Sequence, residues 1–186
     1  MSLNHSSVMG GSTCDRRMSC PGSAALEFAA PPEVPSKYAE EGSFLHLVIE
    51  QILQWDKTPE EMLGFTDNGY TLTRQLLDEM IIPALQCFEK LQEEFGPFDE
   101  YICEQTVHYL GTAAFGTADV IACNDTYSFI LDWKFGRGLK VIGNADNKQL
   151  LFLAGAARET PETADMFSPD RQIVLAIVQP AFAGAS

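Results

Sequence analysis

Two aspartates and a lysine are the residues whose types and spacing most directly suggest chemistry. Asp119 ends the segment GTAD, and Asp132 and Lys134 lie in the segment ILDWK. Side chains alternate along a β-strand, so Asp132 and Lys134 would project from the same face, about 7 Å apart along the chain. If Asp119 lies on the neighbouring strand of a hairpin, two carboxylates and one ammonium group meet there.

Such a group of charges predicts a metal site. Two adjacent carboxylates repel each other unless a divalent cation or a shared proton lies between them. Oxygen ligands favour Mg²⁺ or Mn²⁺ over Zn²⁺. Gly116, which has no side chain, would let a substrate backbone approach closely. The simpler alternative is a solvated ion pair, but the apolar neighbours of Asp132 predict an interior strand, where charges need partners.

The elements that would position these residues follow from the hydrophobic pattern. Ser43 is expected to cap a helix that runs to about Trp55, and a second helix should run from about Thr71 to Phe95 with a kink at Pro83. After these helices the spacing of apolar residues changes from a period of 3.6 residues to a period of two residues, which indicates strands.

Four strands and one more helix are expected in the second half of the chain. Asn124-Asp125 is typical of a hairpin turn between two of the strands. The last strand is almost wholly apolar, so we expect it in the sheet interior. The predicted segments are strands at 100–110, 116–123 and 127–134, a helix at about 147–157, and a strand at 171–179.

Charge is distributed unevenly. The net charge is −14, which alone disfavours a nucleic-acid partner because phosphates require positive potential. From Lys37 to Glu104, 15 acidic and 4 basic residues give −11, whereas from Gln105 to Arg158, 4 acidic and 5 basic residues give +1. A phosphodiester site is therefore expected in the second half.

Length and composition predict one globular α/β domain. Of the 186 residues, 46% are hydrophobic, enough for a sizeable core. We expect a partly ordered arm with a short helix at 1–36, the folded domain at 37–180 and a tail at 181–186. No apolar run approaches the roughly 18 residues of a membrane span, and no signal peptide is evident, so we expect a soluble, cytoplasmic protein with no membrane partner.

The sequence resembles a known nuclease superfamily. Gly116-x-x-Asp119 followed by Asp132-x-Lys134 resembles the core of the PD-(D/E)XK superfamily, in its RecB-like and Cas4-like branch. The N-terminal segment Ser19-Cys20-Pro21-Gly22-Ser23 resembles the opening segment of the family, and more closely still that of an uncharacterised phage-encoded subgroup. Two more features are similar to the branch, namely a His after a Gly on an early helix and a Gln followed by an aromatic residue after the Lys. Here they are Gly42 with His46 and Gln149 with Phe152, although the branch has its aromatic residue at the position of Leu153.

The resemblance implies a fold and a metal centre. The fold is a restriction-endonuclease-like core of the α/β class, with a central mixed four-stranded sheet, an antiparallel meander plus a further strand, flanked by helices. Asp119 and Asp132 would bind Mg²⁺ or Mn²⁺, with His46 and the Trp133 carbonyl as additional ligands. Lys134 would stabilise negative charge in the transition state or orient the attacking water.

Other residues have weaker expected roles. Glu104 would reach the metal or position water, and Gln149 would orient the lysine or bind a phosphate. The basic residues Arg137, Lys140 and Lys148 would contact DNA phosphates. Each has an ordinary alternative as a strand, helix-start or solvated loop residue, and His46 could instead pair with Glu50 one helical turn away.

Two family features are missing. Cas4-like proteins hold an iron–sulfur cluster with one cysteine before the domain and three after the last helix. This chain has five cysteines and none after Cys123, so we expect no iron–sulfur cluster. No Walker motif is present, so ATPase activity would come from another protein, such as a phage recombination or replication protein.

We therefore expect a Mg²⁺/Mn²⁺-dependent deoxyribonuclease, exonuclease-like and of phage or prophage type. One alternative is a catalytically inactive module of the same fold that binds nucleic acid or a partner protein, which the overall acidity favours. Another is that the acidic first half mimics DNA and blocks a host protein that binds nucleic acid.

Overall fold

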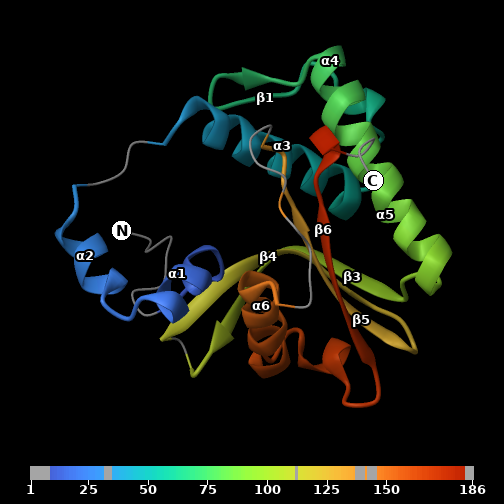
Figure 1. Cartoon of the computed structure of the whole chain (residues 1–186). Coiled ribbons are helices and arrows are strands. Elements are labelled where there is room, and N and C mark those ends of the chain that lie inside the picture. Colours follow the sequence, from blue (N-terminus) through green and yellow to red (C-terminus); the bar gives the residue numbers. More distant parts are fainter. Residues whose placement is uncertain (1–8, 32–34, 112, 137–140, 142–145, 183–186) are drawn as a thin grey trace. The chain divides into compact units, whose positions relative to one another are not determined.

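A computed structural model of the chain describes residues 9–31, 35–111, 113–136, 141 and 146–182 (Figure 1). The chain divides into two compact units. We call them the sheet unit, which comprises Met1–Glu33, Asp99–Leu131 and Gly143–Ala176, and the helical unit, which comprises Val34–Phe98, Asp132–Ile142 and Ile177–Ser186.

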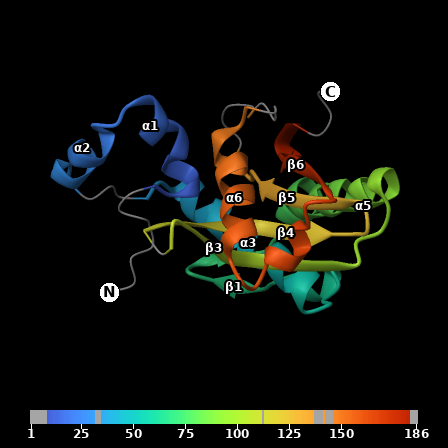
Figure 2. The ribbon, with the colours of Figure 1, turned by 90° about the horizontal axis from the view of Figure 1, so that it is seen from below.

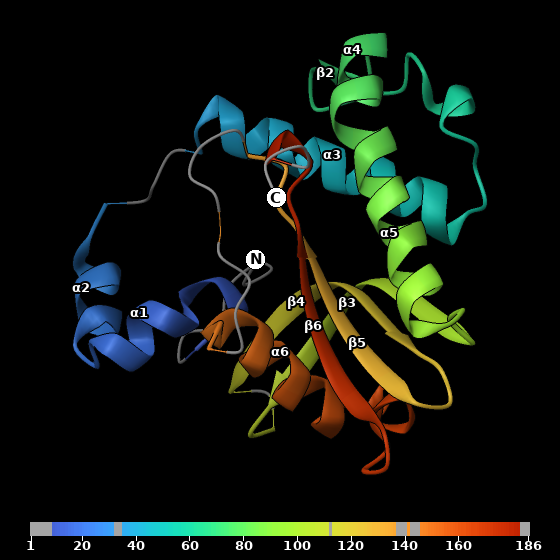
Figure 3. The same ribbon diagram turned by 45° about the vertical axis from the view of Figure 1, so that its right-hand side comes forward.

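A four-stranded sheet has the order β3-β4-β5-β6 (Figure 3). Its strands are β3 (Glu100–Tyr109), β4 (Ala114–Cys123), β5 (Tyr127–Trp133) and β6 (Gln172–Val178). The first three strands pair antiparallel.

The fourth strand makes the sheet mixed. The Gln172 N–H donates to the Thr126 carbonyl, and the Lys134 N–H donates to the Val178 carbonyl. Residue numbers therefore rise together along β5 and β6, which makes this pair parallel. The expected fold class, a mixed four-stranded sheet with an antiparallel meander and flanking helices, is confirmed.

The turn between β4 and β5 forms where the sequence predicts it. The Asn124 side-chain oxygen accepts hydrogen bonds from the backbone N–H groups of Thr126 at 3.0 Å and Tyr127 at 2.8 Å. An asparagine side chain that bonds to its own turn in this way replaces backbone partners that the turn lacks. This turn fixes the register of β4 against β5.

Helix α6 (Lys148–Glu159) packs on β3 and β4 (Figure 2). Its N-cap is Asn147, whose side chain accepts a hydrogen bond from the Leu150 N–H at 3.1 Å. After its end, the Thr160 hydroxyl accepts from the His108 N–H of β3 at 2.8 Å. The predicted helix is confirmed, and polar contacts at both ends supplement its apolar packing.

One strand prediction is wrong. We expected the apolar strand at 171–179 in the interior, but β6 is last in the strand order. Most of β6 is only partly buried, and Ile173 is 43% exposed. A short apolar run predicts a strand, but strand order depends on pairing between distant segments, and an edge strand can carry the same residues.

Two short helices form within the predicted N-terminal arm. A turn η1 (Gly11–Thr13) leads into α1 (Cys14–Ser19), and α2 (Ser23–Ala29) follows. Both η1 and α1 pack against α6. This part of the sheet unit therefore has tertiary contacts.

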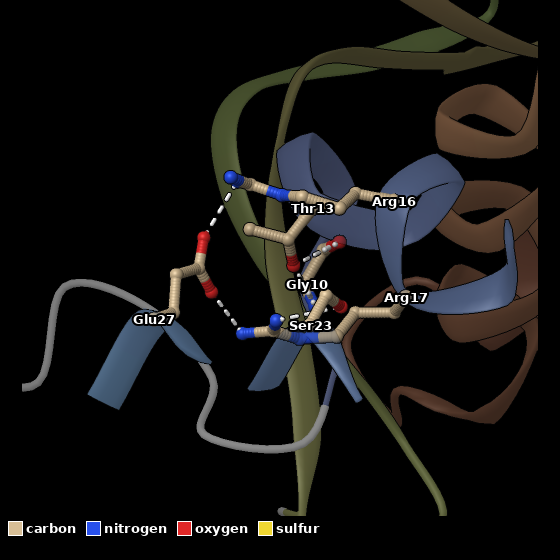
Figure 4. Close-up of polar contacts among 6 residues, drawn as sticks. All are labelled: Gly10, Thr13, Arg16, Arg17, Ser23 and Glu27. Atoms are coloured by element: carbon tan, nitrogen blue, oxygen red, sulfur yellow. Dashed lines mark hydrogen bonds and ion pairs between the residues drawn. The ribbon is translucent and has the colours of Figure 1, made fainter. Parts of the chain in front are cut away.

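Ion pairs on one carboxylate hold α1 and α2 together (Figure 4). Glu27 pairs with Arg16 at 2.6 Å and also with Arg17. The Arg17 guanidinium additionally donates to the Ser23 hydroxyl at 3.1 Å, and its side chain is only 9% exposed. The half-buried Arg17 contact is the stronger constraint, because an exposed pair such as Arg16 with Glu27 adds little.

The helical unit is built from short elements around two longer helices. Its elements are α3 (Lys37–Gln54), η2 (Glu60–Met62), β1 (Thr66–Asp67), β2 (Tyr70–Thr71), α4 (Arg74–Leu76), the π-helical η3 (Leu77–Ile81), α5 (Ile82–Phe95) and η5 (Pro180–Phe182). The short helix η4 (Ala164–Phe167) belongs to the sheet unit.

No helix among the described residues of the chain combines the length and the apolar composition that crossing a membrane requires.

Helix α3 begins earlier than predicted. Its N-cap is Ser36, whose hydroxyl accepts a hydrogen bond from the Ala39 N–H at 3.2 Å. Ser43, the predicted cap, instead lies within the helix and donates to the Ala39 carbonyl at 3.1 Å. The first turns of α3 are polar and exposed, so the apolar pattern does not show them.

The second predicted helix is divided. The segment at 71–95 contains the end of β2, then α4, η3 and α5. The π-helical turn lies directly before Pro83, which is in the first turn of α5. Proline has no N–H and its ring excludes the carbonyl four residues earlier, so the wider turn accommodates it. The expected distortion at Pro83 therefore takes the form of a π-helical turn.

The two serines allow a test of where α3 begins. Ser36→Ala should lower the free energy of unfolding by about 1 kcal/mol, because the Ala39 N–H loses its acceptor. Ser43→Ala should have an effect near zero, because alanine is the better residue within a helix. Urea unfolding of both variants checks this, and a larger loss for Ser43→Ala would contradict the observed helix start.

Candidate active site

Two carboxylates face each other across β3 and β4. The registered pairs Cys103–Val120 and Gln105–Ala118 flank Glu104 and Asp119, which are therefore directly opposite. A carboxylate oxygen of Glu104 and one of Asp119 lie within 4.8 Å of each other. Glu104 is half-buried and Asp119 is 9% exposed, so little water screens their repulsion.

The backbone at Glu104 has an unusual conformation. Its φ angle is +50°, in the left-handed region that residues with a side chain rarely adopt. Between β3 and β4 the backbone pairing is regular on both sides of Glu104 and Asp119, but these two residues are not themselves registered as a pair. Such a conformation costs free energy of the order of 1–3 kcal/mol and occurs most often at functional sites. The expected role of Glu104, at the metal or in positioning water, remains a prediction.

Asp132 and Lys134 form an ion pair at the end of β5. The Lys134 amine lies 2.6 Å and 2.9 Å from the two carboxylate oxygens of Asp132. The side chain of Asp132 is 5% exposed and that of Lys134 is 30% exposed. The same-face relationship expected from strand alternation is therefore present, and the lysine compensates the charge of a buried aspartate.

Trp133, between them, is directed into the hydrophobic core. Its side chain is fully buried, and its ring centroid lies 6.3 Å from that of Phe88 and 6.4 Å from that of Phe135. This packing fixes the end of β5 and so the directions of Asp132 and Lys134. The role of the Trp133 carbonyl as a metal ligand remains a prediction.

His46 lies on α3 and is half-buried. Its ring meets the Phe135 ring edge-on, with centroids 5.3 Å apart and an interplanar angle of 84°. Because Phe135 follows Lys134 by one residue, His46 packs against the segment that leaves β5. The predicted role of His46 as a metal ligand remains a prediction.

The two polar residues at the start of α6 have different surroundings. The Lys148 amine lies 2.9 Å from an Asp15 carboxylate oxygen and 3.3 Å from the Ser19 hydroxyl, both on α1. Gln149 is half-buried beside Gly11. A DNA phosphate at Lys148 would have to replace Asp15, whose side chain is 78% exposed and contributes little binding energy.

The other two predicted DNA contacts, Arg137 and Lys140, lie outside the described residues. Their proposed roles therefore remain predictions. So do the roles assigned to Gln149 and Lys148.

The expectation for Gly116 is wrong. We expected this glycine to leave room for a substrate backbone, but the chain's own N-terminal segment occupies that space. A Cβ atom at Gly116 would lie 3.0 Å from the Gly11 nitrogen and 3.1 Å from a Leu153 methyl group. The glycine is needed because η1 and α6 approach β4 closely.

Sequence reasoning missed the part that the N-terminal segment plays next to this site. The Gly11 backbone packs closely on Gly116, and the Asp15 carboxylate forms an ion pair with the Lys148 amine. The paired glycines Gly10-Gly11 were the available signal, since adjacent glycines permit close backbone packing. Their partner lies more than a hundred residues away, and nothing local in the sequence identifies it.

A protein-family model matches almost the whole chain. Residues 5–186 match the DUF2800 model. The chain belongs to the DUF2800 family. This family is described as "protein of unknown function", and kinship with PD-(D/E)XK nucleases and with a phage-encoded subgroup of them remains a prediction.

Among solved structures, the DUF2800 chain is similar to protein VC1899 from Vibrio cholerae. The two share 11% sequence identity, with a TM-score of 0.34. The match covers 93% of this chain and 51% of VC1899, so the chain spans about half the length of that protein. Similarity at this level carries no argument about fold or activity.

Two glycines test the close packing at β4. Gly116→Ala should lower the free energy of unfolding by about 1–3 kcal/mol, because its Cβ would meet the Gly11 backbone. Gly42→Ala is the matched control and should raise it by about 0.5–1 kcal/mol, because a Cβ at this position in α3 meets nothing within 4 Å. Urea unfolding that shows Gly116→Ala to be as stable as the parent would refute the packing.

Proposed function

We propose that this protein is a Mg²⁺- or Mn²⁺-dependent deoxyribonuclease of the PD-(D/E)XK type, with exonuclease-like activity and a phage or prophage origin. The observation that carries the proposal is the approach of Glu104 and Asp119, whose carboxylate oxygens lie within 4.8 Å on neighbouring strands. The sequence resemblance supports the same interpretation, since Asp119, Asp132 and Lys134 match its central motif.

The donor set fits a hard divalent cation. Glu104 and Asp119 supply carboxylate oxygens, which Mg²⁺ and Mn²⁺ prefer. Carboxylates this close to each other repel, and a cation between them would attract both. The strained backbone of Glu104 is consistent with a carboxylate held for a purpose other than stability.

Asp132 is the proposed partner of Asp119 in this metal centre. Asp132 is included because the segments Gly116-x-x-Asp119 and Asp132-x-Lys134 together match the motif of the superfamily that the sequence resembles. His46 and the Trp133 carbonyl complete the proposed ligand set on the strength of the sequence resemblance.

The proposed chemistry is hydrolysis of a DNA phosphodiester. A bound cation would activate water and polarise the phosphate. The Lys134 amine, held by Asp132, would donate hydrogen bonds to the negative charge that develops on the phosphate oxygens. Glu104 would accept a proton from the attacking water, and Gln149 would donate to a phosphate oxygen.

A second candidate is a catalytically inactive module of the same fold that binds nucleic acid or a partner protein. Two observations favour it, the net charge of −14 and the pairing of Lys148 with Asp15. Both weaken the attraction for a polyanion. Such a module would need neither Mn²⁺ nor the Lys134 amine.

A nuclease assay separates these candidates. The purified chain should degrade DNA with Mg²⁺ or Mn²⁺ when linear and circular, single- and double-stranded substrates are supplied, and the linear forms should shorten from their ends. Lys134→Ala should lower the rate by about 100-fold or more, because a donor to the transition-state charge is lost.

Lys90→Ala is the control, because Lys90 is exposed on α5, and circular dichroism should show that both variants are folded. Asp119→Ala and Asp132→Ala should also be inactive. Variants that cut as fast as the parent, or a parent that cuts no DNA with either metal, would refute the proposed activity.

A further inference from the structure

Two methionine sulfurs lie against the Cys14 sulfur at the start of α1, in the sheet unit. The Cys14 sulfur lies 3.8 Å from the Met9 sulfur and 3.6 Å from the Met18 sulfur. Met18 follows Cys14 by one helical turn, and Met9 precedes η1, so local structure brings all three together. These residues lie outside the proposed nuclease centre.

The two sulfur–sulfur separations from Cys14 are compatible with a three-coordinate metal site. A cation about 2.3 Å from each of three sulfurs in one plane requires sulfur atoms about 4.0 Å apart. The separations of Cys14 from Met9 and from Met18 are within a few tenths of an ångström of this value. A thiol proton can point to only one thioether at a time, whereas a cation would contact both.

We propose that Cys14, Met9 and Met18 form a binding site for a soft monovalent cation, Cu(I). Thiolate and thioether sulfur are the protein ligands that Cu(I) prefers, while Mg²⁺ and Mn²⁺ require oxygen. The site is thus chemically distinct from the carboxylate centre and does not depend on the proposed nuclease function.

Charge selects a monovalent ion over a divalent one. One thiolate and one Cu(I) ion sum to zero, so the bound complex adds no net charge, whereas Zn²⁺ on the same three ligands would leave one positive charge. Most of the residues that line the cavity are apolar, and an excess positive charge among them would be poorly solvated. A neutral complex therefore suits this position best.

The surroundings are apolar and yet accessible. The three sulfur residues line a cavity of about 230 Å³ together with Tyr109 and Phe152. Cys14 is 2% exposed, whereas Met18 is 60% exposed and provides a route by which an ion can enter. Burial raises the pKa of the Cys14 thiol, which keeps the metal-free cysteine neutral within this lining.

The experiment is a competition titration of the full chain with Cu(I) under anaerobic conditions, against a colorimetric chelator strong enough to remove Cu(I) from isolated thiols. The parent should retain one equivalent. Cys14→Ser should lower the affinity by about 100-fold or more, and Met9→Leu and Met18→Leu by about 10-fold each, because leucine keeps the volume but removes the sulfur.

Cys20→Ser is the matched control, because Cys20 is an exposed cysteine six residues from Cys14. It should leave the affinity unchanged, and X-ray absorption of the loaded parent should show three sulfur neighbours. The proposal is overturned if Cys14→Ser binds as tightly as the parent, if Cys20→Ser loses as much affinity, or if both Met→Leu variants bind like the parent.

Discussion

Electrostatic repulsion between carboxylates buried in one sheet is the constraint on which the rest of the proposed site depends. Asp132 is compensated within the chain, because Lys134 contacts both of its oxygens. Glu104 and Asp119 are both acidic and lie within 4.8 Å of each other. Partial burial strengthens their repulsion, and a positive charge between them would remove it. In the proposed function, a divalent cation would provide that charge.

The N-terminal segment packs on the strand that carries Asp119. Gly11 packs on Gly116, three residues before Asp119 on the same strand, and Asp15 pairs with Lys148 at the start of α6. The segment thus packs on β4 at Gly116 and forms an ion pair with the Lys148 amine, which could otherwise contact a phosphate. Its own helices are joined by Glu27, which pairs with two arginines. Residues that we expected to form a partly ordered arm therefore pack on β4 and α6.

Local patterns in the sequence predicted most helices and strands, whereas strand order and the packing of distant segments depend on contacts that these patterns do not contain. The three antiparallel strands, the Asn124 turn and α6 follow from apolar period and turn chemistry, which act over a few residues. The place of β6 at the end of the strand order and the packing of Gly11 on Gly116 depend on partners far away in the chain. The start of α3 was missed because its first turn is polar. The ion pair of Asp132 and Lys134 was predictable because strand alternation alone places both on one face.

Direct measurement of Mn²⁺ binding tests the central claim, that carboxylates of this sheet hold a divalent cation. Electron paramagnetic resonance of the full chain titrated with Mn²⁺ should show one bound ion. In the double variant Glu104→Gln/Asp119→Asn, which keeps side-chain size but removes both charges, the affinity should fall by about 10-fold or more. Equal binding by the parent and the double variant, or no binding by the parent at millimolar Mn²⁺, would contradict the account.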